Sequence, residues 1–334
     1  MRAVVLVGGF GTRLRPLTLT TPKPMLPVGH VPIIERLVGN LAKGGVTDVT
    51  LALGFKPEPF IEAFPDDTCN GVSLHYAVEP EPLDTAGAIK FAAELAGIDD
   101  TFVVANGDVL TDLDIGALVR FHRDNSAEAT IHLVAVDDPS AFGVVALDHK
   151  GKVERFVEKP APGTEPSNQI NAGTYVLEPS VLELIPAGRR VSIERETFPQ
   201  VVARGRLFAM ATDDYWLDTG NPVQYLQANL DLLAGKRHPL GSAGAHHDAQ
   251  VDESALVSNS IVAAGASVGG GATVADSVVL SGAVVEAGAV VTNSVVMGRI
   301  GQGATVDGCV VGLHGVVAPG EHLSDEYRPP PDST

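Results

Sequence analysis

Apolar residues in roughly the first 235 positions fall into two patterns, short unbroken runs and longer stretches at helical spacing. The stretch 33–43 has apolar residues at 33, 34, 37, 38 and 41, which predicts an amphipathic helix. Short runs at 3–7 and 102–105 predict strands buried on both faces. Their alternation predicts an α/β fold, with an open, mostly parallel sheet covered by helices on both faces. Further strands are expected at 46–53, 72–78 and 130–136, and further helices at 85–96 and 115–124.

A second pattern begins near residue 240, where apolar residues recur every six positions. Mostly Gly, Ala, Ser and Thr fill the gaps, and Lys, Phe and Trp are absent from 240–334. A flexible linker would not keep valines in phase over this length, so the period predicts a left-handed parallel β-helix of hexapeptide repeats. The repeated positions are Leu256, Val262, Val268, Val274 and Leu280, then Val285, Val291 and Met297, then Ile300 and Val306.

The change of pattern predicts how the chain is divided. We expect an α/β domain at 1–235, a linker at 236–248, the β-helix at 249–324 and a loosely ordered tail at 325–334. The tail contains three consecutive prolines.

Composition limits the kinds of partner that the protein can bind and indicates its cellular compartment. The formal net charge of −18 argues against binding a nucleic-acid polymer, which needs a basic face. No apolar stretch is long enough for a membrane span, and the N-terminus lacks a signal-peptide pattern. Cys69 and Cys309 are far apart without metal-ligand spacing, so we expect reduced structural thiols in a cytoplasmic protein.

Against this acidic background, the loop after the first strand is basic and rich in glycine. Residues 8–15 read Gly-Gly-Phe-Gly-Thr-Arg-Leu-Arg, and Lys23 follows nearby. Glycines let a ligand approach the backbone, and exposed amides form a concave site for phosphate oxygens. A tight turn without a ligand is the alternative interpretation. A Walker loop is excluded because no Gly-Lys-Ser/Thr triplet follows, and a dinucleotide fingerprint because Leu14 replaces its third glycine.

The longer string decides between these interpretations. Gly-Gly-Phe-Gly-Thr-Arg-Leu-Arg-Pro-Leu-Thr at 8–18, continued by Pro-Lys-Pro-Met-Leu-Pro at 22–27, resembles the signature of the sugar-1-phosphate nucleotidyltransferases, or nucleotide-sugar pyrophosphorylases. The resemblance covers nearly the whole chain and implies a Rossmann-like catalytic domain. It also implies that Arg13 and Lys23 bind a nucleoside triphosphate and stabilise the transition state. The nucleotide-binding positions it implies are Leu6, Gly8, Gly9, Gly11, Thr12, Arg13, Lys23, Glu79, Gly87 and Asp108.

Two aspartates are candidate metal ligands. Asp108 follows a buried strand in Asn-Gly-Asp, and Asp218 lies in Trp-Leu-Asp-Thr-Gly. Phosphate chemistry generally needs a divalent metal, which carboxylates hold, although a capping or turn role is common for such aspartates. The resemblance implies that Asp108 and Asp218 hold one Mg²⁺, with Asp108 also catalytic.

The substrate that carries the sugar has its own candidate residues. The resemblance implies that Glu158 binds sugar hydroxyls and that Lys159 binds the sugar phosphate, where a surface ion pair is the alternative. It also implies that Asn171 and Gly173 form a sugar-contacting turn. An amide side chain can both donate to and accept from hydroxyl groups.

The strings at 7–9, 139–145, 170–173, 192–199 and 215–220 are most similar to the mannose-1-phosphate guanylyltransferase branch of the family. This similarity implies that GTP and mannose 1-phosphate give GDP-mannose and pyrophosphate. A glucose-1-phosphate thymidylyltransferase or another nucleotide-sugar pyrophosphorylase is the alternative. Asp84 stands where the family usually has glycine in its base-binding segment, so it either alters base preference or turns outward. Glu79 or Glu81 could accept the adjacent N–H donors of guanine.

Two rival functions come from other classes. A non-catalytic regulatory homologue would be expected to lose charged site residues, which are all present here. A β-helix acyltransferase would need a catalytic histidine, but no plausible nucleophile lies beside the four in this region, so we expect solvated surface residues. They are His246, His247, His314 and His322. The β-helix also predicts a homo-oligomer.

Overall fold

The structure is a computed structural model that describes residues 1–9, 11–54, 57–237 and 244–331. The chain divides into two compact units, each with its own hydrophobic core. The first unit comprises Met1–Gly9 and Leu37–Trp216, and the second comprises Phe10–Arg36 and Leu217–Thr334. Among the described residues, no helix has the length and apolar character needed to cross a membrane.

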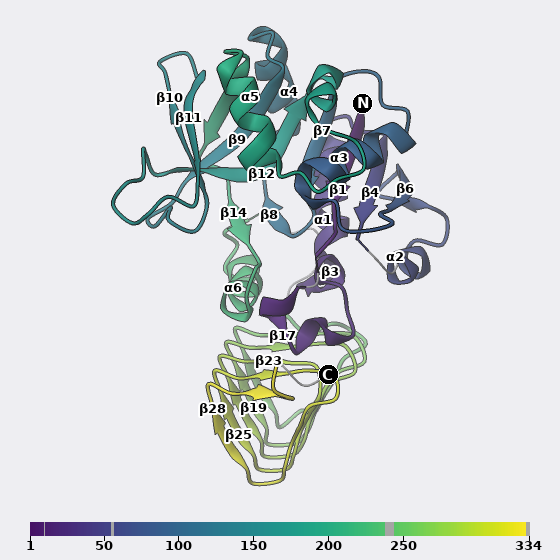
Figure 1. The fold of residues 1–334 in the computed structure, drawn as a ribbon. Helices are drawn as coiled ribbons and strands as arrows, with labels where there is room; N and C mark the ends of the chain where they lie inside the picture. Colours follow the sequence, from purple (N-terminus) through teal and green to yellow (C-terminus); the bar gives the residue numbers. More distant parts are fainter. Residues whose placement is uncertain (10, 55–56, 238–243, 332–334) are drawn as a thin grey trace. The chain divides into compact units, whose positions relative to one another are not determined.

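A ten-stranded mixed sheet forms the centre of the first unit. Its parallel part has the order β7-β1-β4-β6, and antiparallel strands extend it on both sides (Figure 1). The parallel strands are nearly continuous apolar runs, as expected for strands covered on both faces. The strands are β1 (Arg2–Leu6), β4 (Asp48–Leu53), β5 (Thr68–Cys69), β6 (Val72–Val78), β7 (Phe102–Asn106), β9 (Ala129–Ala135), β10 (Gly143–Leu147), β11 (Val153–Glu158), β12 (Gln169–Leu177) and β13 (Leu207–Thr212).

Helices cover this sheet as the sequence pattern predicted. Helix α3 packs against β1, β4 and β6, while α4 packs against β9, β12 and β13 (Figure 1). The expected α/β architecture with helices on both faces is confirmed. The helices are α1 (Ile33–Lys43), α2 (Glu58–Ala63), α3 (Asp84–Leu95), α4 (Ile115–Asp124) and α5 (Phe198–Ala203), with a 3₁₀ segment at Pro179–Leu184 and a π-helical turn at Ile193–Thr197. Two short strands, β8 (Val109–Thr111) and β14 (Trp216–Asp218), pair with each other.

Strand register sets where the glycine loop emerges. Leu6, the last residue of β1, pairs with Ala52 on one side and with Asn106 on the other. The carboxyl ends of these strands therefore lie at one edge of the sheet, where ligands of open α/β sheets bind.

The second unit begins with the signature segment 11–36. It contains 3₁₀ turns at Thr12–Leu14, Leu17–Leu19 and Lys23–Met25, then the hairpin of β2 (Pro27–Val28) and β3 (Val31–Pro32). Helix α6 (Pro222–Leu233) supports this hairpin, because Asn229 Oδ1 accepts the Gly29 N–H at 2.7 Å and the Tyr225 hydroxyl donates to the Pro27 carbonyl.

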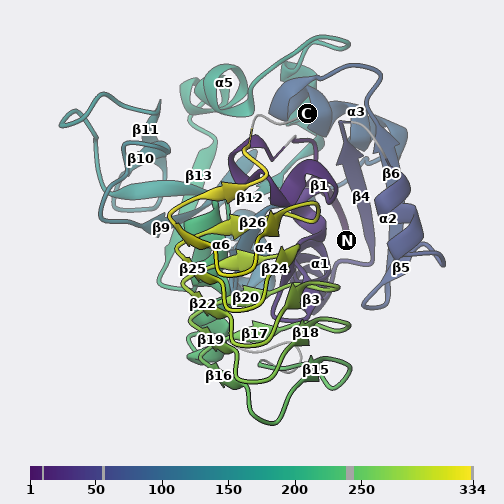
Figure 2. The same cartoon turned by 90° about the horizontal axis from the view of Figure 1, so that it is seen from below.

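The rest of the second unit is a β-helix. Three five-stranded parallel sheets stack short strands in register, with Val251 beside Val268 and Val268 beside Val285 (Figure 2). The predicted hexapeptide β-helix is thus confirmed. Its strands are β15 (Gln250–Val251), β16 (Leu256–Ser258), β17 (Ile261–Val262), β18 (Ser267–Val268), β19 (Thr273–Ala275), β20 (Val278–Val279), β21 (Val284–Val285), β22 (Val290–Thr292), β23 (Val295–Val296), β24 (Arg299–Ile300), β25 (Thr305–Asp307), β26 (Val310–Val311), β27 (Val316–Val317), β28 (His322–Ser324) and β29 (Tyr327–Arg328).

One predicted core position of the β-helix is wrong. Leu256 is 68% exposed, and Val257 packs against the core in its place. Each coil has a short corner at which a residue such as Asn259 or Asp276 has positive φ. The core positions therefore do not repeat strictly every six residues.

The β-helix extends beyond both predicted ends. Ala245 bridges to Val262, within the segment expected to be a linker, and β29 lies in the segment expected to be a loosely ordered tail. Residues 238–243 and 332–334 of those two segments lie outside the described residues.

Both cysteines are buried, as expected for structural thiols. Cys309 continues a ladder of buried serines in which the residue of one coil accepts the backbone N–H of the next. The Cys309 N–H, for example, donates to Ser294 Oγ at 2.9 Å. The Cys309 thiol therefore has a structural role at this corner of the coil.

Candidate functional site

The glycine loop follows β1 and lies close to Gly54 and Glu79 of the first unit. A Cβ on Gly8 would lie 3.2 Å from the Gly54 nitrogen and 3.4 Å from Glu79 Oε1, so glycine permits this close approach. Gly9 faces open space, since a Cβ on it would have no described atom within 4 Å beyond its immediate chain neighbours. The loop therefore brings backbone amides next to a carboxylate that the sequence assigned to nucleotide binding.

Glu79 is buried and held by the segment that follows it. Its side chain is 8% exposed, and Oε2 accepts the Leu83 N–H at 2.8 Å. Burial raises the pKa of Glu79, and the charge of Asp84 raises it further, whereas the hydrogen bond from Leu83 lowers it. A carboxylate oxygen has more than one lone pair, so this anchoring leaves acceptor capacity for a ligand.

Asp84 has a conformational explanation. Its φ is +62°, in the left-handed region that glycine adopts most easily and aspartate tolerates better than most residues. The side chain is exposed, and its Oδ1 accepts the N–H of Thr85 at 2.8 Å. The positive φ explains why the family usually has glycine at this position, and Asp84 adopts the same backbone conformation.

Helix α3 begins at this point and packs tightly against residues 189–194. A Cβ on Gly87 would lie 2.8 Å from the Arg189 carbonyl oxygen, and the Gly87 N–H donates to the Val191 carbonyl at 3.3 Å. Thr85 Oγ1 donates to Glu194 Oε2 at 2.9 Å. Backbone packing thus accounts for Gly87, and its predicted nucleotide contact remains a prediction.

The segment after β7 approaches β1 in the same way. A Cβ on Gly107 would meet Val7 Cγ1 at 2.6 Å and the Leu6 carbonyl oxygen at 2.9 Å. The Gly107 N–H donates to that carbonyl at 2.8 Å. These contacts fix Asp108 immediately beyond the strand, where it is partly buried.

The expected sugar-contacting turn is a bulge in β12. The register with β9 shifts between Asn171 and Tyr175. Within the bulge, Asn171 Nδ2 donates to the Tyr175 hydroxyl at 2.9 Å and Asn171 Oδ1 accepts the Gly173 N–H at 3.0 Å. Trp216 Nε1 donates to the Ala172 carbonyl at 2.9 Å. The amide of Asn171 is therefore held in one orientation.

Glu158 lies at the end of β11, in a weakly solvated environment. Burial raises its pKa, and the charge of Glu194 raises it further, whereas Lys159 and Arg195 lower it. A Cβ on Gly143 would lie 2.8 Å from Glu158 Oε2, so the neighbouring strand approaches this carboxylate closely. The structure brings Glu194 near the predicted sugar-binding residues, although sequence reasoning had given it no role. Its only signal was its place in the string at 192–199.

The second unit holds the other predicted charges. Lys23 Nζ lies 3.3 Å from Asp218 Oδ1, with the Lys23 side chain 8% exposed and that of Asp218 19% exposed. A Cβ on Gly220 would lie 2.8 Å from Asp218 Oδ2 and 2.9 Å from Arg13 Nη2. Arg13 and Asp218 thus lie against a glycine whose missing side chain makes room for both, and Lys23 lies beside Asp218.

The turn that carries Arg13 is locally determined. Gly11 has a φ of +56°, and Thr18 Oγ1 donates to its carbonyl at 2.7 Å. Thr12 and Arg13 follow, both exposed. Phe10, in the same loop, lies outside the described residues.

The chemistry of the donor set suits a hard divalent cation, which family members generally use. Asp108 in the first unit and Asp218 in the second each offer carboxylate oxygens, the ligands that Mg²⁺ prefers, and their sharing of one ion remains a prediction. The Lys23 ammonium group donates a hydrogen bond to Asp218 Oδ1 at 3.3 Å, which orients this carboxylate.

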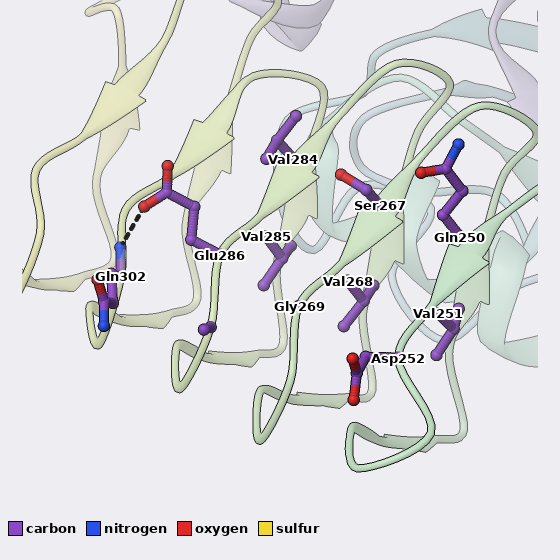
Figure 3. Close-up of a pocket in the computed structure, with 11 residues that line it drawn as sticks. Gln250, Val251, Asp252, Ser267, Val268, Gly269, Val284, Val285, Glu286 and Gln302 are labelled. Carbon is purple, nitrogen blue, oxygen red and sulfur yellow. Dashed lines mark hydrogen bonds between the residues drawn. The ribbon is translucent and has the colours of Figure 1, made fainter.

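A groove of about 610 Å³ lies on the β-helix, where Gln250, Ser267 and Val284 follow one another on successive coils (Figure 3). Glu286 accepts the Gln302 N–H at 2.8 Å at one end of it. None of the described lining residues is a histidine, so this groove lacks the catalytic base that an acyltransferase would need.

The chain is similar to known proteins over most of its length. Residues 2–235 match the family described as nucleotidyl transferase, and residues 243–326 match the GlmU-like C-terminal hexapeptide family. A mannose-1-phosphate guanylyltransferase of Mycobacterium tuberculosis is 42% identical over 80% of this chain and 76% of that protein. A mannose-1-phosphate guanyltransferase of Yarrowia lipolytica is 45% identical over 72% of this chain and 66% of that protein.

A solved structure is also similar. HddC from Yersinia pseudotuberculosis has a TM-score of 0.59 and 32% identity, covering 68% of this chain and 97% of that chain, and a second structure of it is complexed with GMP-PN (TM-score 0.58). The family match across residues 2–235, together with relatives above 40% identity, confirms the resemblance seen in the sequence. The chain therefore belongs to the nucleotidyl transferase family.

Proposed function

We propose that this protein is a sugar-1-phosphate nucleotidyltransferase that converts GTP and mannose 1-phosphate to GDP-mannose and pyrophosphate. The observation that carries the reaction type is the placement of Arg13 and Asp218 against Gly220, with Lys23 beside Asp218, in a member of this family. The choice of substrates is supported by relatives named for mannose-1-phosphate guanylyl transfer and by the related structure that holds GMP-PN.

The reaction is a single in-line displacement. A phosphate oxygen of mannose 1-phosphate forms a bond to the α-phosphorus of GTP while the bond from that phosphorus to the bridging oxygen of the β-phosphate breaks. Pyrophosphate leaves with the electron pair. Positioning and charge neutralisation are sufficient for this chemistry, so no covalent enzyme intermediate is needed.

Each charged residue has a role in this proposal. Arg13 and Lys23 bind the triphosphate and offset the negative charge that grows on the leaving group. Lys159 holds the sugar phosphate, while Glu158 and Asn171 orient the sugar ring. Asn171 suits this role because Tyr175 and Gly173 already fix its amide.

The loop after β1 surrounds the triphosphate. Amides of Gly8, Gly9, Gly11 and Thr12 face the phosphate oxygens, with Gly8 giving the close approach that its contacts require. Glu79 accepts N–H donors of guanine with the lone pairs that Leu83 leaves available. Leu6 and Gly87 are assigned to the nucleotide as well.

Mg²⁺ is the proposed cation, held by Asp108 and Asp218. When bound, it would supply charge neutralisation at the phosphate oxygens. The proposal also assigns the catalytic role to the domain expected at 1–235. It further takes the protein to be a cytoplasmic homo-oligomer, supported by the reduced cysteines and the β-helix.

Initial rates of pyrophosphate release test this function. GTP, dTTP, UTP and ATP should each be paired with mannose 1-phosphate and with glucose 1-phosphate in Mg²⁺. The proposal expects the highest kcat/KM for GTP with mannose 1-phosphate, and an Asp108→Asn variant should lose orders of magnitude in kcat. A clear preference for dTTP and glucose 1-phosphate would replace the guanylyl assignment. No turnover with any pair would favour a regulatory homologue.

A further inference from the structure

A cluster of histidines in the second unit takes no part in the proposed chemistry. His246, His247 and Asp248 lead into the first coil of the β-helix, where the His246 N–H donates to the Val262 carbonyl at 2.8 Å. His30 lies in the turn between β2 and β3. Although the sequence suggested solvated histidines here, the side chain of His246 is only 22% exposed, while that of His247 is 81% exposed.

The ligand atoms of the cluster are close together. One nitrogen of each imidazole and one oxygen of Asp248 all lie within 4.8 Å of one another. His247 Nε2 is 3.3 Å from Asp248 Oδ2, and His246 Nδ1 is 3.7 Å from the same oxygen. Two ligands bound at about 2.0–2.1 Å to a tetrahedral zinc ion lie about 3.3 Å apart, so these separations approach those of a zinc site.

His30 supplies the second observation. Its ring packs edge-on against the ring of His246, with centroids 5.0 Å apart. Both of its ring nitrogens are buried. His30 is therefore a closely packed neighbour that holds the His246 ring in place.

We propose that His246, His247 and Asp248 form a site for a zinc-class transition metal ion, with His30 packed against His246. Two imidazoles and one carboxylate favour Zn²⁺, Ni²⁺ or Cu²⁺ over Mg²⁺, which prefers an all-oxygen set. Binding at His246 Nδ1 replaces the hydrogen bond that this atom accepts from the Asp248 N–H at 3.1 Å. The bound ion would fix His246 beside His30, which lies in the hairpin that follows Lys23, all within the second unit.

Calorimetric titration of untagged, chelator-treated protein with ZnCl₂ tests the site, with excess Mg²⁺ present to occupy oxygen ligands. One equivalent should bind to the wild-type protein. The His246→Ala/His247→Ala variant should lose this binding by about 100-fold or more, because even changes outside the ligand shell cost roughly 10- to 100-fold. His30→Ala should weaken it by about tenfold or more with the stoichiometry unchanged.

Matched controls come from the same domain. His314→Ala and His322→Ala remove exposed histidines of later coils and should bind zinc like the wild-type protein. Circular dichroism establishes that each variant is folded, and the melting temperature of the wild type, but not of the double variant, should rise with zinc. Equal zinc binding by the double variant would overturn the site, and unchanged affinity in His30→Ala would overturn the supporting role of His30.

Discussion

Lys23 is the residue whose removal tests the site most sharply. Its ammonium group is nearly buried and lies 3.3 Å from Asp218 Oδ1. Lys23→Met keeps most of the apolar stem and removes the charge. We expect a folded protein with a large loss of kcat, because the triphosphate loses a cation aimed at its leaving group.

The Lys23→Met substitution should have two separate effects, a loss of stability and a loss of kcat. Losing one partner of a buried ion pair destabilises a protein by about 3–5 kcal/mol, and partial exposure of Asp218 reduces the expected loss to about 1–3 kcal/mol. Losing one preorganised charge-stabilising group typically lowers kcat by about 10²–10³-fold. Adding Asp218→Asn should restore stability, because the unpaired carboxylate is gone, yet leave activity low.

Two measurements distinguish these effects, urea unfolding for stability and pyrophosphate release at saturating substrates for kcat. Lys236 provides the matched control, because it pairs with Asp231 at 2.7 Å in the same unit but has no role in the site. Lys236→Met should retain wild-type kcat. The reasoning is refuted if Lys23→Met retains near-normal kcat, or if its double variant with Asp218→Asn regains activity along with stability.

Three further predictions concern backbone conformation, packing and pH. Asp84→Gly should stabilise the fold by up to about 1 kcal/mol in urea unfolding, because φ is +62° there, and leave the preference for GTP over dTTP unchanged; an altered base preference would give Asp84 a part in base selection. Gly220→Ala should lower kcat by about 10²-fold in a folded protein, since the new Cβ displaces Asp218 and Arg13; an unchanged kcat would contradict this. Burial lowers the pKa of His132 from 6.5 to about 4, so the unfolded chain binds more protons between these values. The free energy of unfolding should therefore fall by about 1.4 kcal/mol per pH unit as the pH drops from 6.5 to about 4. In urea unfolding, the His132→Gln variant should lack this pH dependence.

Local pattern was sufficient to predict much of the fold. The helix at 33–43 is found with those bounds, because its apolar stripe is a property of consecutive residues. The hexapeptide period likewise predicted the β-helix, since every coil must bury the same side against its neighbours. Leu256 was wrongly predicted to be a core residue, because the short corner at Asn259 changes the spacing between core positions. A strict period of six residues cannot account for such a corner.

The candidate site was predictable only in part. Arg13, Lys23 and Asp218 were identified through a family signature, and only the fold shows that Gly220 makes room for two of them. Glu194 received no role because 36 residues separate it from Glu158, whose pKa it raises. Contacts of this kind depend on tertiary structure rather than on spacing.

The central claim is the identity of the product. Equimolar GTP, dTTP, UTP and ATP should be incubated in one vessel with mannose 1-phosphate, glucose 1-phosphate, Mg²⁺ and the enzyme, and the sugar nucleotides identified by mass spectrometry. We expect GDP-mannose to form first and to predominate, with one pyrophosphate released per product. Predominance of dTDP-glucose or any other sugar nucleotide would contradict it.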